Sequence, residues 1–336
     1  MEVCGTHTMA IARSGIRSLL PESLELISGP GCPVCVTEAS YLDGALLLAG
    51  RADSPIIATY GDMVRVPGSS GSLAEARARG ARVEVVYSSQ KAVELAEANP
   101  DRQVVFLAVG FETTAPGTAL ALRRARDEKL ANFSVLVAHK LIPPAMRALL
   151  EAGDDRIDGF LCPGHVSVII GYEAYAELAR NYRRPCVVAG FDPLQILSGV
   201  EAILEQLAEG KAEAASVYPS AGRRGNPEAL KLLEEVFVPC ESAWRGIGTI
   251  PGSGLALGEL WREFDAEKRF GLPKIESHDP PLCRCGEVIR GRCQPWECGL
   301  FGKRCTPRDP VGPCMVSSEG ACAAAYKYGP LRPGRG

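Results

Sequence analysis

The sequence predicts an α/β protein with two similar lobes built around parallel sheets, followed by a small Cys-rich C-terminal domain. Short β-branched runs alternate with Ala-, Leu- and Glu-rich segments over the first two-thirds of the chain. Most of these runs are continuously apolar, as in strands that are buried on both faces. The alternation ends near residue 210, before a segment rich in Cys, Gly and Pro. Repeated strand–helix alternation is typical of βαβ units and parallel sheets.

The expected elements follow one another in regular order. The strand candidates are the apolar runs at 24–28, 55–60, 82–87, 103–109, 134–139, 158–162 and 185–190. Segments with helical spacing lie between them, at about 38–50, 72–80, 89–98, 117–130, 143–152, 168–181 and 193–209. Because the pattern restarts near residue 100, we expect one lobe over 1–99, a second over 100–209 and the Cys-rich domain over 210–336.

Composition and charge argue against several classes of protein. The 336 residues carry a formal net charge of −3 and no long basic block, so we expect no nucleic-acid partner. No apolar run approaches the roughly 18–20 residues of a membrane span, and the start carries no signal-peptide pattern. Neither a P-loop nor a GxGxxG after a strand is present, so nucleotide binding has no support. We expect a cytoplasmic protein without a membrane partner.

The 13 cysteines are the most informative residues, because clustered thiols in a cytoplasmic protein indicate metal or redox chemistry. Seven of them crowd the last 54 residues, a turn-rich segment that hydrophobic burial alone rarely folds. Intervals of six, eight and seven residues separate Cys298, Cys305, Cys314 and Cys322. This spacing matches neither paired zinc knuckles nor the tight run of simple ferredoxins. An iron–sulfur cube, a zinc site and buried free thiols stay open, and the neighbouring candidates are Cys283, Cys285 and Cys293.

A separate thiol pair occurs in the segment Cys32-Pro-Val-Cys35. It follows the strand at 24–28 and a Gly-Pro-Gly turn, and it precedes the helix expected from about residue 38. A C-x-x-C at a strand-to-helix turn is typical of thioredoxin-like redox sites, where helix amides stabilise a thiolate. Half of a zinc knuckle and two inert thiols are the alternatives.

Cys4 and His7 lie at the very start of the chain. The segment around them has the pattern of a strand end followed by a helix that begins near Thr6. Gly5 would allow a ligand to approach the backbone. Taken alone, an inert Cys and a hydrogen-bonded His also explain the pair.

Other polar residues follow expected strands. Glu112, Thr113 and Thr114 follow the strand at 103–109, and His165 follows the strand at 158–162. In open α/β sheets, sites form where loops leave the carboxyl ends of strands. Capping of the next helix by the threonine hydroxyls is the alternative explanation.

Seven segments occur in a fixed order along nearly the whole chain: CGTHT, GPGCPVC, GFETTAP, HKLIPPAM, GHVSVIIG, WRGIGTIPGSGL and CGLFGKRCTPRDPVGPCMVSSEGAC. Together they resemble the HypD hydrogenase maturation family. Members of this family usually carry some tens of residues before the CGTH motif, whereas this chain begins almost at it. From this difference we expect that the start is truncated or is assigned to an internal Met.

The resemblance implies a scaffold on which the Fe(CN)2CO group of [NiFe]-hydrogenase is assembled. It implies two partners, a small HypC-type chaperone and a HypE-type protein that supplies cyanide from a thiocyanate on its own C-terminus. It implies that Cys4 holds the iron, with His7 beside it, and we expect an exposed, mobile position that helps handover. Thiolate ligands suit this soft, electron-rich iron.

The resemblance also assigns the other residues. It implies that Cys32 and Cys35 are a redox dithiol, and that a [4Fe-4S] cluster is held by Cys298, Cys305, Cys314 and Cys322. The GFETT and GHVS motifs would complete the site with Glu112, Thr113, Thr114 and His165.

Two rival functions use part of the same set. A thiol–disulfide oxidoreductase fed by an iron–sulfur cluster would need the dithiol and the cluster but not Cys4. A zinc-stabilised adaptor protein would need neither iron nor redox chemistry. Iron content separates the adaptor from the others, and a requirement for Cys4 separates the oxidoreductase.

Overall fold

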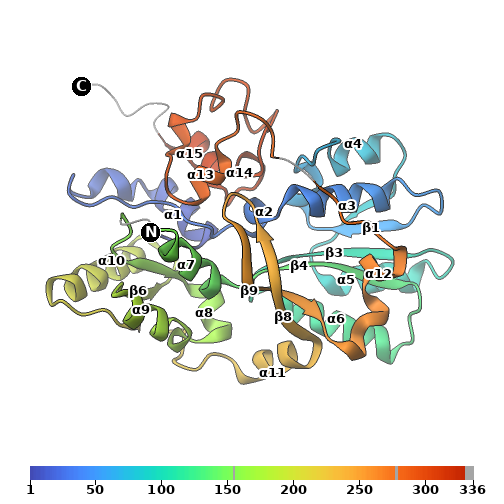
Figure 1. Ribbon diagram of the computed structural model, residues 1–336, viewed down its shortest axis with the longest axis horizontal. Coiled ribbons are helices and arrows are strands. Elements are labelled where there is room, and N and C mark those ends of the chain that lie inside the picture. Colours follow the sequence, from blue (N-terminus) through green and yellow to red (C-terminus); the bar gives the residue numbers. More distant parts are fainter. Residues whose placement is uncertain (154–155, 277–278, 330–336) are drawn as a thin grey trace.

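The computed structural model describes residues 1–153, 156–276 and 279–329. Two parallel sheets lie on either side of a central antiparallel hairpin, and the Cys-rich C-terminal unit packs on top of both (Figure 1). The predicted α/β class, with parallel sheets and a Cys-rich C-terminal region, is confirmed.

The first sheet has the strand order β2-β1-β3-β4, and all neighbours are parallel. Its strands are β1 (Ile56–Thr59), β2 (Val83–Val85), β3 (Val104–Gly110) and β4 (Phe133–His139). One face packs against α3 (Ala39–Ala49), and the other packs against α5 (Ser89–Ala98) and α6 (Ala115–Asp127). Every residue of β3 is buried, which is why its sequence is continuously apolar.

This sheet crosses the boundary that we expected near residue 100. β3 pairs with β1 on one edge and with β4 on the other, so strands from both expected lobes share one sheet. Periodicity identifies strands but carries no information about their order, and the break between sheets lies between β4 and the next strand.

The second sheet contains β5 (Phe160–Pro163), β6 (Cys186–Ala189) and β7 (Ala214–Ser216), again all parallel. The first residues of the chain extend it, because Glu2 forms parallel bridges with both Ser28 and Leu161. The expected strand at 24–28 is only this bridge. The opening segment therefore belongs to the second lobe rather than the first, and α1 (Gly5–Ser14) packs against α10 (Pro193–Ala208).

The remaining helices around the lobes are short. They are η1 (Ile16–Leu19), α2 (Pro33–Val36), η2 (Gly61–Arg65), α4 (Leu73–Ala78), α7 (Ile142–Glu151), α8 (Gly164–Ile170), η3 (Tyr172–Tyr175) and α9 (Ala176–Tyr182). The single helix expected at 168–181 is divided because Gly171 has a φ of 78°, which interrupts a right-handed helix.

A two-stranded hairpin that the sequence did not indicate stands between the lobes. α11 (Pro227–Val236) leads into β8 (Phe237–Trp244), which pairs with β9 (Gly248–Leu257). Trp244 stacks on Phe111 from the end of β3, with ring centroids 6.0 Å apart. The hairpin thus reaches the carboxyl edge of the first sheet.

The C-terminal unit, residues 279–329, follows η4 (Glu259–Phe264) and α12 (Ala266–Phe270). It contains little regular structure, as its composition predicted, and consists of turns and the short helices α13 (Cys285–Ile289), η5 (Pro295–Glu297), α14 (Pro313–Val316) and α15 (Ala321–Tyr328). Across the described ranges, no helix combines the length and apolarity needed to cross a membrane.

Candidate functional site

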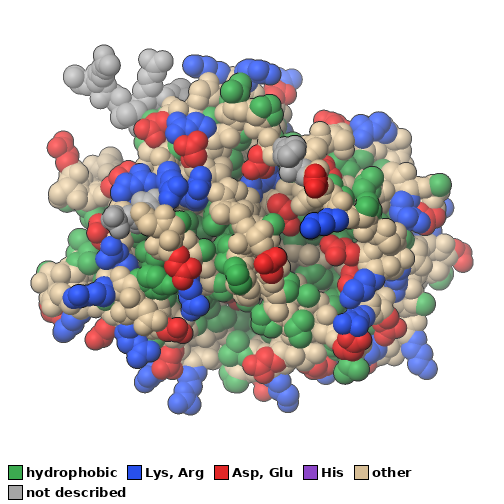
Figure 2. All heavy atoms as spheres, in the orientation of Figure 1, with side chains coloured by type: hydrophobic (Ala, Val, Ile, Leu, Met, Phe, Trp, Pro, Cys, Tyr) green, Lys and Arg blue, Asp and Glu red, His purple; other side chains and the backbone are tan. Residues whose placement is uncertain are grey.

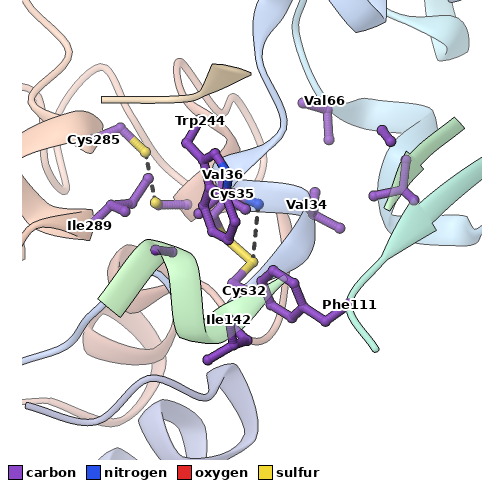
Figure 3. Close-up of a cluster of buried hydrophobic side chains, with 14 of the residues drawn as sticks. Cys32, Val34, Cys35, Val36, Val66, Phe111, Ile142, Trp244, Cys285 and Ile289 are labelled. Atoms are coloured by element: carbon purple, nitrogen blue, oxygen red, sulfur yellow. Dashed lines mark hydrogen bonds between the residues drawn. A yellow bond between two sulfur atoms is a disulfide. The ribbon is translucent and has the colours of Figure 1, made fainter. Parts of the chain in front are cut away.

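The predicted thiol sites meet where the C-terminal unit packs against the two lobes. α2, which carries the C-x-x-C pair, contacts α13 and α14, and α1 contacts α15. Figure 3 shows Phe111, Ile142 and Trp244 around Cys32, with Cys285 of the C-terminal unit nearby. Motifs from the start, the middle and the end of the chain therefore share one buried region.

Cys32 and Cys35 form a disulfide whose Cα atoms lie 5.2 Å apart. Cys32 is the N-cap of α2, and its sulfur accepts a hydrogen bond from the Cys35 amide at 3.2 Å. α2 ends after one turn and α3 begins at Ala39, so the pair precedes a short helix of its own rather than the long one. The two cysteines are 5% and 2% exposed. Solvent therefore has little access to the disulfide.

Cys4 lies directly against the loop that leads to this disulfide. It is the N-cap of α1, and the next amide, that of Gly5, donates to the Gly31 carbonyl at 2.8 Å. A Cβ on Gly31 would stand 2.1 Å from the Cys4 nitrogen, so only glycine permits this approach. Cys4 is buried, at 7% exposure, which corrects the expectation of an exposed position.

Burial decides the protonation of Cys4. It raises the pKa of the thiol to about 12, although the nearby backbone amides of His7 and Thr6 act in the opposite direction. The negative charge of Glu319 raises the pKa further. The start of α1 therefore does not produce a free thiolate. A metal ion that binds here must displace a proton.

His7 is held in one tautomer. Its Nε2 lies 2.8 Å from the Gly190 carbonyl, and because a carbonyl only accepts, Nε2 carries the hydrogen. Nδ1 is then an acceptor, and it is buried without a partner among the described residues. Burial lowers the pKa of His7 to about 4, so the ring is neutral. His7 thus offers one unpaired nitrogen lone pair next to the CGTH turn.

His165 lies on the same side of the second sheet as His7. It follows β5, and its exposed ring packs on Phe191 with centroids 4.1 Å apart. The Phe191 ring also packs on the His7 ring, with centroids 5.0 Å apart. The CGTH and GHVS motifs therefore come together through the Phe191 ring at the carboxyl ends of β5 and β6.

The GFETT motif occupies the carboxyl end of β3. Glu112 Oε1 accepts a hydrogen bond from the Ile142 amide at 2.9 Å, whereas Oε2 is buried without a partner in the described structure. Burial raises the pKa of Glu112 to about 7. Thr114 is the N-cap residue of α6 and donates to the Phe111 carbonyl at 3.3 Å, and Thr113 is exposed.

Glu319 is a site residue that the sequence analysis did not single out. It comes from the loop between α14 and α15, and its Oε1 accepts a hydrogen bond from Thr6 Oγ1 at 2.7 Å. A Cβ on Gly5 would stand 2.9 Å from its Oε2. The only sequence signal that could have identified Glu319 was its position in the VSSEGAC segment. Arg245, in the WRGIG segment, was missed in the same way.

Six thiols line one narrow apolar pocket in the C-terminal unit. They belong to Cys283, Cys285, Cys298, Cys305, Cys314 and Cys322, and apolar residues such as Val288, Leu300, Phe301 and Met315 complete the walls. The four predicted cluster ligands are all among them. The sulfur atoms of Cys285 and Cys314 lie 2.7 Å apart. Cys293 does not line the pocket.

This donor set fits a soft, multinuclear metal group. Among the residues that the structure describes, no three His, Cys, Asp or Glu side chains converge as ligands of a single metal ion. A [4Fe-4S] cluster binds its four thiolates at separate iron atoms, so its ligands surround a volume rather than one point. Burial raises the pKa of the Cys305 and Cys322 thiols, so they stay neutral unless a metal displaces their protons.

Comparisons with known proteins agree with one another. A family model described as "HypD: Hydrogenase formation hypA family" matches residues 1–329. The chain is 48% identical to "Hydrogenase maturation factor HypD" of Azotobacter vinelandii, over 99% of this chain and 89% of that protein. It is 46% identical to "Hydrogenase maturation factor HypD2" of Bradyrhizobium diazoefficiens (99% and 90%) and to "Hydrogenase maturation factor HypD" of Escherichia coli K12 (98% and 88%).

Proposed function

Because this chain belongs to the HypD family, we propose that it is a hydrogenase maturation scaffold that holds iron while the Fe(CN)2CO group of [NiFe]-hydrogenase is assembled. One observation supports this most strongly. The Cys4 backbone lies against Gly31, the residue before Cys32, and helices that carry the C-x-x-C pair and Cys4 both contact the C-terminal unit with its thiol-lined pocket. An iron site, a redox pair and an electron store would thus be neighbours.

Cys4 is the proposed ligand of the substrate iron. Its thiolate suits a soft iron that carries CO and cyanide. A second thiol from a HypC-type chaperone would complete the attachment, so the iron would be held between two proteins. Because Cys4 is buried, binding of that chaperone must open a path to it. His7 lies beside Cys4 in the CGTH motif and is proposed to support this site, and its Nδ1 is an acceptor without a partner among the described residues.

Cys32 and Cys35 are the proposed source of electrons for cyanide release. Cleavage of the S–C bond in a thiocyanate, R–SCN, consumes two electrons and one proton and yields R–SH and CN⁻. Oxidation of the dithiol to the observed disulfide releases two electrons and two protons, so the exchange balances with one proton left over. The thiocyanate would come from a HypE-type partner, and the cyanide would go to the iron on Cys4.

Cys298, Cys305, Cys314 and Cys322 are the proposed holders of a [4Fe-4S] cluster. When bound, such a cluster would supply single electrons for reduction of the disulfide. α14, which contains Cys314, contacts α2 directly, so the transfer distance is short. The diatomic ligands or their donor are proposed to be oriented by polar residues at two strand ends. These residues are Glu112, Thr113 and Thr114 at the end of β3 and His165 at the end of β5.

Two rival functions differ from this proposal in what they require. A thiol–disulfide oxidoreductase would need Cys32, Cys35 and the cluster but not Cys4, whereas the proposed scaffold needs Cys4. A zinc-stabilised adaptor would hold zinc and no iron. We place the scaffold in the cytoplasm, where free thiols are kept reduced.

Complementation tests the proposal. A strain that lacks its own HypD-type gene is given the wild-type chain, Cys4→Ala, Cys32→Ser or the matched control Cys240→Ser, whose thiol lies on β8 outside the three sites. Wild type and the control should restore hydrogenase activity, and the other two should not. Full activity with Cys4→Ala would overturn the iron-holding role, and full activity with Cys32→Ser would make the disulfide structural.

A further inference from the structure

A short turn between Cys298 and Cys305 forms one wall of the thiol-lined pocket. The Phe301 amide donates to the Cys298 carbonyl at 2.9 Å, and Gly302, with a φ of 66°, bends the chain back. The Cys305 amide then donates to the Leu300 carbonyl at 2.9 Å. Both cysteines line the pocket, so this turn, residues 298–305, connects two of the four proposed cluster ligands.

The 298–305 turn brings the pocket close to solvent. Of the six pocket thiols, Cys283 and Cys298 are half-buried and the other four are buried. A Cβ on Gly299 or Gly302 would meet nothing within 4 Å, so no other described part of the chain packs over these two positions. Towards the lobes the pocket is covered, because α13 and α14 contact α2, and α15 contacts α1. A cluster in the pocket would thus be reached from solvent across this turn.

Two adjacent cations belong to this turn. Lys303 and Arg304 are exposed, and neither side chain has an ion pair or hydrogen bond among the residues that the structure describes. The C-terminal unit carries seven Lys or Arg and five Asp or Glu, whereas the whole chain has a formal net charge of −3. Lys and Arg side chains lie along the top of this unit, beside exposed hydrophobic ones (Figure 2). The turn therefore presents a positive surface on a chain that is negative overall.

The proposed redox cycle requires an electron donor from outside the chain. Reduction of the Cys32–Cys35 disulfide consumes two electrons and two protons and yields two thiols. A [4Fe-4S] cluster transfers electrons singly, so a donor must supply it twice in each cycle. Because both cysteines are buried, a donor protein cannot reach the disulfide directly. Contact at the 298–305 turn, close to the pocket, is the route that the exposed surface offers.

We propose that the 298–305 turn is the docking surface for an acidic one-electron carrier protein of the ferredoxin type, which Lys303 and Arg304 attract. This inference rests on the proposed function, because a donor is needed only if the pocket holds a cluster. At each encounter the donor is oxidised by one electron and the cluster is reduced by one. Two encounters supply the two electrons that the disulfide takes up together with two protons from solvent.

The charge and size of the surface suit such a partner. Redox encounters bury less surface than stable complexes do, and opposite charges steer them to high association rates. Two unpaired cations on a small turn meet both conditions. Trp296, which is exposed and lies two residues before Cys298, adds an apolar contact of the kind enriched at protein interfaces.

Mixing the iron-loaded full chain with a reduced, acidic [2Fe-2S] ferredoxin in an anaerobic stopped-flow instrument tests this. The wild-type cluster should be reduced at low salt, and the rate should fall steeply at about 1 M salt, where charges are screened beyond about 3 Å. Lys303→Glu combined with Arg304→Glu should lower the rate at low salt by about tenfold or more, because charge steering contributes this much. The dissociation constant for the oxidised ferredoxin, measured by calorimetry, should rise by a similar factor.

The matched control reverses another adjacent pair, Arg223→Glu with Arg224→Glu. Both arginines are exposed and shortly precede α11, which lies at the opposite end of the molecule from the C-terminal unit (Figure 1). The net charge changes by the same amount in both variants, so an unchanged rate in this control assigns the effect to the turn. Excess dithionite should reduce the cluster fully in all three proteins, which checks that the cluster is intact.

The outcomes separate this inference from the proposed function. A wild-type chain that holds no iron would overturn both. An iron-loaded wild type that dithionite reduces and ferredoxin does not, or one whose rate is independent of salt, would overturn this inference alone, and so would equal effects of the two charge reversals. Should the reversal at the turn cost the chain its iron, Lys303→Gln with Arg304→Gln takes its place, and an unchanged rate in that variant contradicts the docking role.

Discussion

Burial outweighs local helix effects at the ionisable residues of the site. The amides at the start of α1 favour a Cys4 thiolate, yet burial raises the pKa of that thiol to about 12. Glu112 follows the same rule, with a pKa of about 7, and it also retains an unpaired carboxyl oxygen. Burial therefore disfavours the charged forms of both Cys4 and Glu112. A metal that binds Cys4 would have to displace its proton.

The Glu112 carboxyl predicts a pH-dependent stability. Its pKa is about 7 in the folded chain and 4.5 when exposed, so the folded chain binds more protons between these values. The free energy of unfolding therefore falls as pH rises from 4.5 to 7, by about 3 kcal/mol for this one group. Glu112→Gln keeps the acceptor for the Ile142 amide and cannot ionise.

Chemical unfolding at about pH 5 and about pH 8 measures this contribution. The loss of stability between the two pH values should be smaller in Glu112→Gln than in wild type. Glu2, whose pKa burial also raises to about 7, is present in both proteins and cancels in the difference. An identical pH dependence in the two proteins would show that Glu112 ionises freely.

At the scale of single residues, the sequence indicated which residues to consider but not their environment. The motifs named Cys4, His7, Glu112 and the thiols of the C-terminal unit as candidates, and the structure places them near the junction of the units. Burial of Cys4 was not predicted, because it depends on Glu319 and its neighbours, which pack over it from the other end of the chain. Such contacts leave no periodic pattern.

At the scale of elements, close backbone approach holds the CGTH turn and the CPVC loop together. Gly31 permits the start of α1 to lie against the segment that leads into α2. Both helices begin at a cysteine N-cap, so the glycine sets the spacing between two reactive residues. This spacing is a backbone property that no side-chain substitution elsewhere can restore.

Gly31→Ala should separate the two helix starts. Its Cβ would lie 2.1 Å from the Cys4 nitrogen and 2.4 Å from the Cys4 Cα, and backbone atoms cannot move aside as a flexible side chain does. We expect a loss of about 1–3 kcal/mol in the free energy of unfolding, measured by urea titration, and loss of hydrogenase maturation. Gly299→Ala, where a Cβ meets nothing within 4 Å, is the control and should do neither. Wild-type stability of Gly31→Ala would refute the close approach.

Most of the parallel strands were predictable because, like β3 and β4, they are short, continuously apolar runs that are covered on both faces. β7 (Ala214–Ser216) was not predictable in this way, because it is only partly buried and lies beyond residue 210, where the expected alternation ends. The hairpin was not predictable either, because Pro239 and Pro251 argue against strands. A two-stranded hairpin tolerates proline since each of its strands is an edge. The alternation in β8 and β9 is also interrupted by Gly and Ser, which hides the period of two.

At the scale of the whole molecule, the C-terminal unit joins the two lobes through its helices α13, α14 and α15. It contacts α1 of one lobe region and α2 of the other, so an ordered cluster would stabilise the junction of both. Its few short helices supply little packing of their own. Metal binding and the assembly of the site are therefore expected to be coupled.

Cys314→Ala tests this coupling. Anaerobically purified wild type should be brown and contain about four irons per chain, as a cubane requires. Cys314→Ala should lose most of the iron and become sensitive to proteolysis in the C-terminal unit. Cys293→Ala, whose thiol lies outside the pocket, should keep both iron and resistance. A full cluster in Cys314→Ala would shift the ligand set towards Cys283 or Cys285, and zinc in place of iron would overturn the cluster.

Infrared spectroscopy of the complex with a HypC-type chaperone tests the central claim, that Cys4 holds the iron of the Fe(CN)2CO group. Metal-bound CO and cyanide absorb at roughly 1900–2150 cm⁻¹, the range expected for diatomic ligands on soft iron. The wild-type complex, purified anaerobically, should show these bands, and His7→Ala should show them weakened. Cys4→Ala should be folded and brown, because its cluster thiols lie elsewhere, but should show none. Bands of normal intensity in Cys4→Ala would contradict the account, because the iron would then be held at another site.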